Sequence, residues 1–490
     1  MPVLTLMQNG CSHKIPFSAP ISLQQVLQDA GVQVEHPCGG KGKCGKCAVK
    51  LAGNVSEPNA AEIAAGTRLS CQAMLYGDAT VWLTSATMEQ IELGANARAI
   101  TPVDGRYGAA VDIGTTTIAL TLCRLSDGAV LASRGCENPQ RSIAADVIGR
   151  IEAALGGQLS LLQTLVLDAV QNLLSKACLS AEIPEDQVDA LVITGNTTML
   201  YLLTGRDPEP LSHAPFRADC LFGCDTTILG RRTYLPPCMD AFVGADITCA
   251  VLASRMTETP VTALLCDVGT NGEIALWKDK TLHVTSTAAG PAFEGAGISC
   301  GCGSIRGAID KVWLDGEKVW CHTIGDTTAV GLCGSGLIDA IAALLKTEDI
   351  DETGAMEEEE LPLAESVRLL PKDVRAVQLA KAAIAAGIQT ILEASETTES
   401  EITEFIICGG FGSHLNLQSA ADIGLIPEAL IHKATVAGNA ALSGALQLLL
   451  DRSSRQKAEQ IAASSQHFNL GGNPKFNENY IDQMFFPEVN

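Results

Sequence analysis

Aromatic residues make up only 4% of this 490-residue chain, and acidic residues outnumber basic ones so far that the formal net charge is −23. Because nucleic acids are polyanions that attract Lys and Arg, this charge predicts no nucleic-acid partner. The chain also lacks an apolar run of about 20 residues, the length that spans a bilayer, so we expect no membrane partner. The opening stretch MPVLTLMQNG has neither the basic nor the apolar region of a secretory signal, which predicts a cytoplasmic protein.

Cysteine, in contrast, is abundant, with 18 residues in the chain. In a protein without an export signal, these thiols are expected to stay reduced and either to bind metal or to lie buried. The hydrophobic fraction of 47% is typical of a globular protein. The length predicts more than one domain.

Residues 1–85 have the pattern of a small mixed domain. The stretch VLTLMQNGCSHKIPF contains two extended runs around Asn9-Gly10, which is a strong hairpin signal. A short helix is expected after Ser22, whose side chain can cap its first turn. A turn is expected at Gly77-Asp78, before a closing strand. Hairpin, helix and returning strands together predict a β-grasp domain.

Four cysteines in this domain have the spacing of an iron–sulfur site. Cys38, Cys44 and Cys47 lie in the Gly-rich stretch HPCGGKGKCGKCAVK, and Cys71 follows in RLSCQA. Irregular Gly-rich backbone can direct N–H groups at sulfur, and a distant segment can supply the fourth ligand of a [2Fe–2S] cluster. A structural zinc site usually divides its ligands into two closely spaced pairs, and Cys71 lacks such a neighbour. The pattern favours the cluster over zinc or buried thiols, and the gaps resemble those of adrenodoxin-like ferredoxins.

Residues 86–106 lose the strand pattern and predict a linker to a second domain, residues 107–490. In that domain, YGAAVDIGTTTIALTLCRL and ALLCDVGTNGEIALW each run from an apolar strand through Asp-x-Gly-Thr into another strand. A pattern that occurs twice indicates internal duplication. We expect halves at about 107–255 and 261–450, with a C-terminal tail, 451–490, packed back on the domain.

The two Asp-x-Gly-Thr stretches have the chemistry of a phosphate site. Small residues expose backbone N–H groups to phosphate, hydroxyls add donors, and a carboxylate can hold Mg²⁺, mostly through water. We therefore expect Asp112 and Asp267 to be catalytic. The cofactor-binding residues expected here are Gly114, Thr115, Thr116, Gly269, Thr270 and Asn271.

A third stretch, EFIICGGFGSHLN, is an apolar strand followed by glycines. Such a loop lets a base and ribose lie against the backbone, which makes Gly409, Gly410 and Phe411 candidate nucleotide contacts. Two helices rich in Ala and Gly, in residues 242–256 and 434–451, have the composition of closely crossing helices.

Together these segments resemble the ASKHA superfamily, which includes acetate and sugar kinases, Hsp70 and actin. Residues 112–117 and 266–273 are similar to its two phosphate motifs, residues 407–412 to its adenosine motif, and the two helices to its connecting segments. The resemblance implies an α/β domain of two RNase-H-like halves that binds Mg-ATP in the cleft between them.

The whole chain resembles a narrower family, the reductive activators of corrinoid-dependent enzymes. A [2Fe–2S] domain precedes the motifs VDIGTTT, ENPQ, ITGNTTM, CDVGTNGE, AAGPAFEGA, GLCGSGLID and ICGGFGSH. The resemblance implies an ATP-hydrolysing activase that passes a low-potential electron from its cluster to the inactive Co(II) corrinoid of a methyltransferase or corrinoid protein, restoring Co(I). It implies an upstream electron donor and is compatible with a homodimer. No Asp-x-His-x-x-Gly surrounds a histidine, so the cobalt is expected on the partner.

Two other functions remain open. An ASKHA-type small-molecule kinase with a redox-sensing ferredoxin module would share the ATP motifs, but it needs a substrate pocket with a general base, and none is identifiable. An activator of a radical dehydratase or reductase also resembles these ATPases. Such activators hold a [4Fe–4S] cluster between subunits, which the fused Cys38–Cys71 unit argues against.

Further assignments are weaker. Asp246, at the start of a helix, occupies the place of a polar group that orients water in Hsp70 and actin relatives, or it stabilises the helix dipole. Glu273 is either close to the metal or a strand-edge carboxylate. Gly334 and Ser335 open a helix whose N-terminus can bind phosphate or allow close packing. Paired cysteines outside the cluster pattern are expected to be buried thiols: Cys220 with Cys224, and Cys300 with Cys302.

Overall fold

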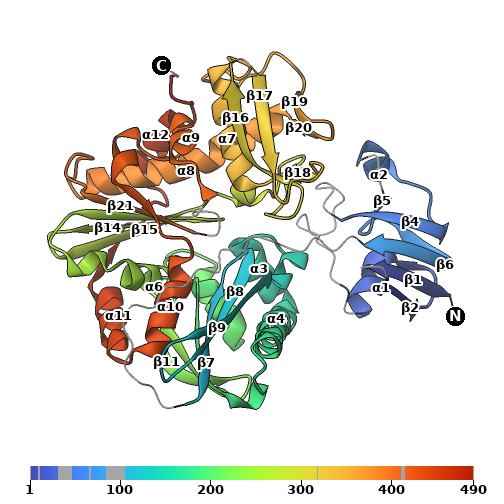
Figure 1. Ribbon diagram of the computed structural model, residues 1–490, viewed down its shortest axis with the longest axis horizontal. Coiled ribbons are helices and arrows are strands. Elements are labelled where there is room, and N and C mark those ends of the chain that lie inside the picture. Colours follow the sequence, from blue (N-terminus) through green and yellow to red (C-terminus); the bar gives the residue numbers. More distant parts are fainter. Residues whose placement is uncertain are drawn as a thin grey trace. The chain divides into compact units, whose positions relative to one another are not determined.

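The computed structural model describes the chain except for Met1 and residues 9–10, 31, 33–46, 66–67, 84–104, 317, 410–413 and 489–490. The chain divides into two units, whose elements are labelled in Figure 1. The first unit comprises Met1–Thr87 and Pro139–Gln158, and the second comprises Met88–Asn138 and Leu159–Asn490.

The first unit contains a mixed sheet and short helices. Its elements are β1 (Val3–Gln8), β2 (Cys11–Pro16), β3 (Ile21–Ser22), α1 (Leu23–Asp29), β4 (Ala48–Val55), α2 (Ala60–Ala65), β5 (Arg68–Leu69), β6 (Met74–Leu83) and, from the second segment, α3 (Val147–Ala153). The strand order is β2-β1-β6-β4-β5, with β3 also paired to β6. β1 runs antiparallel to β2 and parallel to β6. This arrangement confirms the predicted β-grasp fold.

Helix α1 begins where the sequence predicted it. The Ser22 hydroxyl accepts a hydrogen bond from the N–H of Gln25 at 3.1 Å, which satisfies one of the donors that a helix start leaves unpaired. Leu23, Val26 and Leu27 are buried, as expected for residues spaced three and four apart on one helix face. They pack with the strands in the core of this unit.

The expected turn at Gly77-Asp78 is wrong, because both residues lie inside β6. β6 pairs with β4 at Leu75 before them and with both β1 and β4 at Ala79 after them, so the strand continues past this point. The pairing with β4 is irregular at this point, because Asn54 alone lies opposite residues 76–78 of β6. The Asp78 carboxylate accepts the N–H of Val3 at 2.8 Å, so its turn-forming side chain is used in a contact with β1.

The second unit contains two six-stranded sheets. The first consists of β7 (Tyr107–Ile113), β8 (Thr117–Arg124), β9 (Val130–Glu137), β10 (Val188–Gly195), β11 (Phe222–Ile228) and β12 (Arg231–Pro237). The second consists of β13 (Ala263–Val268), β14 (Gly272–Lys278), β15 (Thr281–Thr287), β21 (Glu404–Cys408), β22 (Ala434–Val436) and β23 (Ser465–His467). Two smaller sheets consist of β16 (Ala308–Asp315), β17 (Lys318–Thr323) and β18 (Gly331–Leu332), and of β19 (Leu361–Ala364) and β20 (Val367–Leu369).

Five of the six strands in each large sheet follow the same order. The strand orders are β11-β12-β10-β7-β8-β9 and β22-β21-β13-β14-β15-β23. In each, three consecutive strands form an antiparallel meander, and the first of them pairs in parallel with a later strand, β10 or β21. The repeated order confirms the duplicated α/β fold that the two Asp-x-Gly-Thr stretches predicted.

The helices of this unit are α4 (Leu159–Ser180), α5 (Thr197–Thr204), α6 (Ala245–Ser254), α7 (Gly334–Lys346), α8 (Pro371–Ala394), α9 (Leu417–Asp422), α10 (Ala440–Leu450), α11 (Ser453–Ser464) and α12 (Pro474–Asp482). The two helices predicted to cross closely, α6 and α10, do so. A Cβ atom on Gly444 would lie 2.0 Å from the carbonyl oxygen of Cys249, so only glycine allows this approach. One hydrophobic cluster contains both helices and residues of both large sheets.

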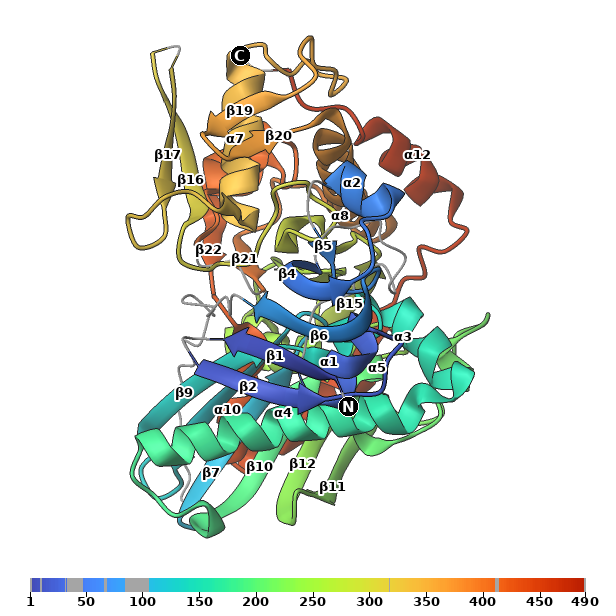
Figure 2. The same cartoon turned by 90° about the vertical axis from the view of Figure 1, so that its right-hand side faces the viewer.

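By length and composition alone, Val147–Ser180 could cross a membrane. The helix is not regular throughout, because Gly157 has a φ of 93°. Helix α4 by itself packs on β8, β9 and α5 (Figure 2). It buries Leu162, Val166 and Val170, a spacing typical of a helix that covers one face of a sheet.

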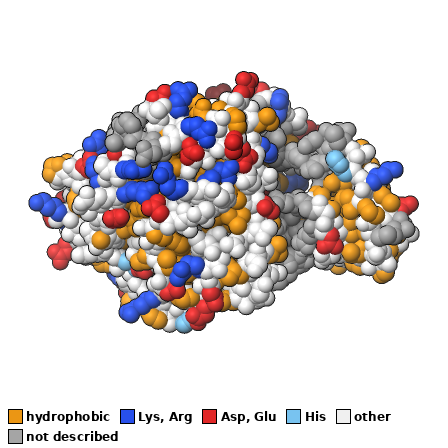
Figure 3. Space-filling view, turned by 90° about the horizontal axis from the view of Figure 1, so that it is seen from below, with side chains coloured by type: hydrophobic (Ala, Val, Ile, Leu, Met, Phe, Trp, Pro, Cys, Tyr) orange, Lys and Arg blue, Asp and Glu red, His pale blue; other side chains and the backbone are white. Residues whose placement is uncertain are grey.

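The C-terminal residues contact the second large sheet and its helices. β23 pairs in parallel with β15, α11 packs on α6, and α12 packs on α8. The buried side chains of Gln378 and Lys381 donate to the carbonyl oxygens of Met484 and Phe485. On the face drawn in Figure 3, acidic and basic side chains are interspersed with apolar ones.

Candidate functional site

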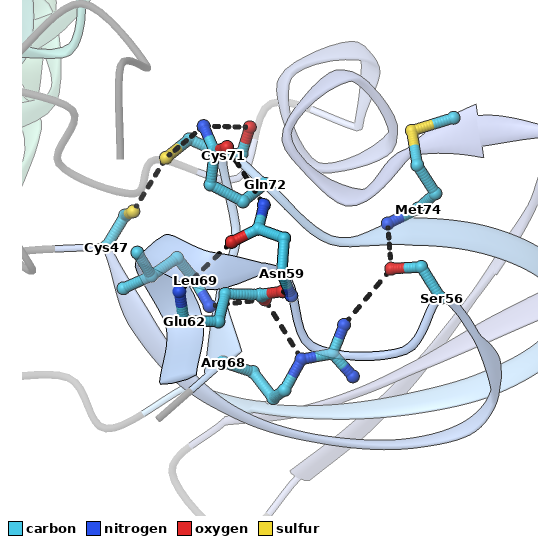
Figure 4. Close-up of polar contacts among 9 residues, drawn as sticks. All are labelled: Cys47, Ser56, Asn59, Glu62, Arg68, Leu69, Cys71, Gln72 and Met74. Atoms are coloured by element: carbon cyan, nitrogen blue, oxygen red, sulfur yellow. Dashed lines mark hydrogen bonds and ion pairs between the residues drawn. The ribbon is translucent and has the colours of Figure 1, made fainter. Parts of the chain in front are cut away.

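Two of the four predicted cluster ligands lie side by side in the first unit (Figure 4). Cys47 directly precedes β4, Cys71 follows β5, and their sulfur atoms are 3.2 Å apart. Cys38 and Cys44 lie outside the described residues. Thiolates that ligate the same iron of a [2Fe–2S] cluster must converge in this way, so the described pair fits the cluster.

A buried carboxylate orders the chain that leads to Cys71. Glu62 accepts hydrogen bonds from the Arg68 side chain at 2.9 Å and from the N–H groups of Leu69 and Asn59, both at 3.0 Å. Burial acts to raise the pKa of Glu62, but these N–H donors and Arg68 lower it below its ordinary value. Glu62 is therefore held as an anion that connects the backbone of Asn59 and Leu69 with the side chain of Arg68 (Figure 4).

Hydrogen bonds also order the backbone and one sulfur atom of this pair. The N–H of Ser70 donates to the carbonyl oxygen of Cys47 at 2.9 Å, and the Gln72 amide donates toward the sulfur of Cys71 at 3.5 Å. Burial is the main cause that raises the pKa of the Cys47 thiol to about 12. A metal ion is therefore needed to hold Cys47 as a thiolate, while hydrogen bonds to sulfur adjust the reduction potential of a bound cluster.

In the second unit, both Asp-x-Gly-Thr stretches form the tips of antiparallel hairpins. Asp112 lies near the end of β7 and Asp267 near the end of β13. The turn after β7 is closed by the N–H of Gly114, which donates to the carbonyl oxygen of Thr117 at 2.9 Å. The turn after β13 is closed by Gly269, whose N–H donates to Asn271 at 3.0 Å. The two halves thus hold the same motif at the tip of a hairpin, with a loop one residue shorter in the second half.

The two tips meet at their threonines. The hydroxyl oxygens of Thr116 and Thr270 are 3.4 Å apart. Thr270 donates to both carboxylate oxygens of Glu294 at 2.9 Å, and Thr116 donates to one of them. The carboxylate of Glu294 therefore connects the hairpins of the two halves.

Four carboxylates gather behind these tips and repel one another. Burial raises the pKa of Asp112 to about 7 and that of Asp267 to about 6, and the charge of Asp267 adds to the effect on Asp112. Burial also raises the pKa of Asp246, with the charges of Asp112 and Asp267 as further causes. The pKa of Glu273 is raised by burial and by the charges of Asp246 and Asp267. Raised carboxyl pKa values of this kind are typical of functional sites.

The geometry limits how this group could hold a metal. Within the part of the chain that the structure describes, no three His, Cys, Asp or Glu residues are close enough to share one metal ion. Mg²⁺ keeps most of its water and often takes only one or two carboxylates together with phosphate oxygens. Asp112 and Asp267, which are both partly exposed, fit that kind of binding.

Two asparagines anchor the first hairpin from the starts of helices. Asn196 caps α5, and its amide donates to the hydroxyl of Thr115 at 3.1 Å. Asn439 caps α10, and its amide donates to the carboxylate of Asp112 at 2.9 Å. The sequence analysis assigned no role to either residue. The available signal was an Asn just before an apolar helix in ITGNTTM and in AGNAAL, because Asn is a favoured helix cap.

The helix that starts at Gly334 was expected either to bind phosphate or to pack closely. A Cβ atom on Gly334 would lie 1.9 Å from the carbonyl oxygen of Phe293. The hydroxyl of Ser335 is buried and donates to the carbonyl oxygen of Asp310 at 2.9 Å. These contacts favour the close-packing alternative, because the Ser335 proton is already used within the protein.

The predicted adenosine loop is described only at its start. Gly409 follows β21, and with a φ of 113° a Cβ atom there would lie 2.4 Å from the carbonyl oxygen of Val268. Glycine is therefore needed for β21 to end against β13. Gly410 and Phe411 lie outside the described residues.

Comparison with known protein families gives three adjoining matches. Residues 6–76 match the 2Fe-2S iron-sulfur cluster binding domain, residues 107–259 the RACo middle region, and residues 261–490 the C-terminal domain of RACo, the ASKHA domain. The matches cover the cysteine pair, the first hairpin and the second hairpin in turn.

Individual proteins are similar over most of the chain. The corrinoid activation enzyme RamQ of Eubacterium limosum is 33% identical over 78% of this chain and 70% of its own length. A [Co(II) methylated amine-specific corrinoid protein] reductase of Methanosarcina barkeri is 24% identical over 78% of this chain and 77% of its own length.

A solved structure, the reductive activator for corrinoid,iron-sulfur protein, covers 99% of both chains with a TM-score of 0.74 and 26% identity. Similarity on this scale includes the [2Fe–2S] unit as well as the ASKHA unit. The chain therefore belongs to the reductive activators of corrinoid-dependent enzymes, in which a [2Fe–2S] ferredoxin domain is fused to an ASKHA-type domain.

Proposed function

We propose that this chain uses ATP hydrolysis to reduce the inactive Co(II) corrinoid of a methyltransferase or corrinoid protein to Co(I). One electron passes from the reduced [2Fe–2S] cluster to the cobalt on the partner. The observation that carries the proposal is the presence, in one chain, of the paired thiols of Cys47 and Cys71 and of two Asp-x-Gly-Thr hairpins that meet at Thr116 and Thr270. A redox site and a phosphate site on the same chain are what such coupling requires.

The difference in reduction potential between the cluster and the Co(II) corrinoid explains why ATP is needed. Plant-type [2Fe–2S] centres have potentials near about −400 mV, and Co(II) corrinoids are in general harder to reduce. For a one-electron transfer, each 59 mV of mismatch changes the equilibrium about tenfold. Nucleotide binding can supply the difference if it changes how tightly the activator binds the Co(II) and Co(I) forms of its partner.

The proposed roles in the second unit follow from the contacts around the hairpins. The backbone and hydroxyl groups of the two tips donate to the phosphates of ATP, and the carboxylates of Asp112 and Asp267 orient Mg²⁺ through its water ligands. Asp246, whose pKa is raised by burial and by the charges of Asp112 and Asp267, is suited to accept a proton from the attacking water. We further propose that Gly409, Gly410 and Phe411 contact the nucleoside.

The partners are inferred from the same chemistry. The cobalt is carried by a separate corrinoid protein or methyltransferase, and a low-potential donor recharges the cluster after each turnover. The low-potential chemistry of the proposed reaction supports a cytoplasmic location. A homodimer is compatible with the proposal, and neither nucleic acid nor a membrane takes part in it.

The first experiment tests the cluster. Protein purified without oxygen is expected to contain two irons and two sulfides per chain, to bleach on reduction and to give a rhombic S = 1/2 signal. Cys71→Ser and Cys44→Ser are expected to remove or alter that signal. Cys220→Ser, which lies outside the cluster pattern, is the matched control. Zinc in place of iron would contradict the assignment.

The second experiment tests the coupling. Reduced protein is mixed with candidate Co(II) partners, with and without Mg-ATP, and the absorbance of Co(I) is followed. Co(I) is expected only when the cluster, Mg-ATP and both hairpin aspartates are present. Partner binding should also stimulate ATP hydrolysis more in the Co(II) than in the Co(I) state, because coupling between two binding sites is reciprocal. An equal yield of Co(I) without ATP would instead favour the kinase alternative.

A further inference from the structure

Glu294 belongs to neither phosphate motif, yet its carboxylate lies at the point where the two motifs meet. It ends the short 3-10 turn η6 (Pro291–Glu294). Thr270 donates its hydroxyl to both carboxylate oxygens at 2.9 Å, and Thr116 donates to one of them. Each hydroxyl has one proton, and Glu294 accepts both of them. The side chain therefore engages the hydroxyl donors that the proposed function assigns to phosphate.

The chemistry of a carboxylate makes this a competition. A carboxylate and a phosphate group are both anionic acceptors that prefer the same hydroxyl and N–H donors. They also repel each other when they approach closely with little water between them. If the terminal phosphate of a nucleotide binds Thr116 and Thr270, Glu294 cannot keep its present hydrogen bonds.

We propose that Glu294 is a displaceable latch, which holds the hydroxyls of Thr116 and Thr270 when no terminal phosphate is bound and is expelled when ATP binds. The proposal rests on the proposed nucleotide site and adds a means by which that site distinguishes ATP from ADP. ADP lacks the third phosphate, so it leaves the latch closed. Glu294 is in this sense a positioning residue that senses the nucleotide.

The residues on either side of Glu294 connect it to other parts of the second half. The preceding residue, Phe293, is buried in the core of the second half. Its carbonyl oxygen is in close contact with Gly334 at the start of α7. The following residue, Gly295, has a φ of 76° and packs tightly on the backbone of Cys302. We expect a shift of Glu294 to be passed on to the start of α7 or to residues 295–302, because the backbone on both sides of Glu294 is tightly packed against them.

The test compares nucleotide affinities of the full-length protein with its cluster loaded. Calorimetry measures Mg-ADP and the Mg-complex of a non-hydrolysable ATP analogue against wild type, Glu294→Ala, Glu294→Gln and Glu365→Gln. Glu365 is an exposed glutamate away from both hairpins and is the matched control. Removing the competing charge in Glu294→Ala should tighten binding of the analogue about tenfold, since hydrogen bonds to a charged group are of that strength.

The other affinities sharpen the test. ADP affinity should stay within about twofold of wild type in all variants, because each tenfold change needs about 1.4 kcal/mol that ADP does not gain. Glu294→Gln should lie between wild type and Glu294→Ala, since its amide oxygen can still accept one hydroxyl. A residue that only stabilises the fold would weaken both nucleotides and lower the melting temperature. A residue that only orients water would lower kcat and leave affinity unchanged, and either result overturns the latch.

A measurement on the wild-type protein covers the case in which Glu294→Ala does not fold. Amide hydrogen exchange in residues 295–302 should increase with the ATP analogue and not with ADP. Equal exchange with both nucleotides would overturn the latch alone. A wild-type protein that binds neither nucleotide would overturn the proposed function as well, so the two failures are distinguishable.

Discussion

The two hairpins of the ASKHA unit have the same motif but different surroundings. Asp112 accepts an amide hydrogen bond from Asn439, which caps a helix of the other half. Asp267 has instead the thiol of Cys408 at 3.5 Å and lies opposite Glu273 in the hairpin register. At the position opposite Asp112, the first half has Ala119. Duplication has thus kept the motif while the neighbours have diverged.

The comparison shows which features of the site both halves keep and which features differ between them. Both halves keep the aspartate and the Gly-Thr turn, which a phosphate and its Mg²⁺ need from two sides. Among the described residues, Asp112 is hydrogen-bonded to a residue of the other half, Asn439, whereas Asp267 contacts Cys408 of its own half. The second half places a carboxylate, Glu273, directly opposite its aspartate in the hairpin register, where the first half has Ala119.

Removing either aspartate should have the largest effect on Mg-ATP hydrolysis. We expect this effect to be equal for the two halves. Asp112→Asn and Asp267→Asn are each expected to lower Mg-ATP hydrolysis at least about 100-fold, because each removes a charge that orients the metal. The visible spectrum of the cluster should not change, since the cysteines lie in the other unit. The measurement is steady-state phosphate release. Wild-type rates in both variants would show that the hairpins do not form the ATP site.

Disturbing the contact between α6 and α10, which joins the two halves, is expected to have the next largest effect. Gly444→Ala places a Cβ atom 2.0 Å from the carbonyl oxygen of Cys249, and such overpacking destabilises by about 1–3 kcal/mol. Thermal unfolding should report this loss, together with weaker nucleotide binding. Gly156→Ala is the control, because nothing lies within 4 Å of its Cβ position. Equal melting temperatures for both variants would mean that α6 and α10 do not join the halves tightly.

Changing the neighbours of the two aspartates should affect ATP hydrolysis differently in the two halves, whereas removing the aspartates should affect it equally. Asn439→Ser keeps a helix-capping oxygen but loses the amide that reaches Asp112, and we expect ATP hydrolysis to fall about tenfold, as for other groups that orient a metal-binding carboxylate. Cys408→Ala removes the matching neighbour of Asp267 and should change the rate less than about twofold, because a thiol is a weak donor. Equal losses in the two variants would contradict the asymmetry.

The pH dependence of the free energy of unfolding should show the smallest difference between the two aspartates. Folding raises the pKa of Asp112 from 3.8 to about 7 and that of Asp267 to about 6, chiefly by burial. The folded protein therefore binds more protons than the unfolded chain in this range, and the free energy of unfolding of the nucleotide-free protein falls as pH rises from about 4 to 7.

Neutral variants at these two positions should flatten that slope. Asp112→Asn should recover on the order of 1 kcal/mol at pH 7 after screening by solvent, and Asp267→Asn somewhat less. Denaturant titrations at pH 5 and pH 7 measure the change. Glu365→Gln is a control for the substitution itself. A steeper slope in Asp112→Asn would contradict the raised pKa.

Several features were predictable from short stretches because they depend on local chemistry. The helix cap at Ser22, the two Asp-x-Gly-Thr turns and the crossing helices around Gly444 each follow from residue types whose preferences act over a few positions. The cysteine spacing predicted a metal site for the same reason. Family resemblance then extended these local signals to a fold, and the repeated strand order of the two large sheets confirmed it.

Other features depend on which segments come together, and no short stretch contains that information. Gly77-Asp78 has the composition of a turn, yet the pairing of Leu75 and Ala79 before and after it makes it part of β6. The helix start at Gly334 and Ser335 reads equally well as a phosphate site, and only its contact with Phe293 and Asp310 distinguishes packing from binding.

By itself, the sequence determined the ligand types, the duplicated motif and the family, because these lie in residue identity and spacing. Only the tertiary structure decided that Asn439 reaches Asp112 across 327 positions and that Glu294 lies between Thr116 and Thr270. Such contacts arise because the two sheets pack around α6 and α10 and bring both hairpin tips to one place. The burial that raises the carboxyl pKa values is a property of that packing, since desolvation depends on all neighbours in space and not on neighbours along the chain.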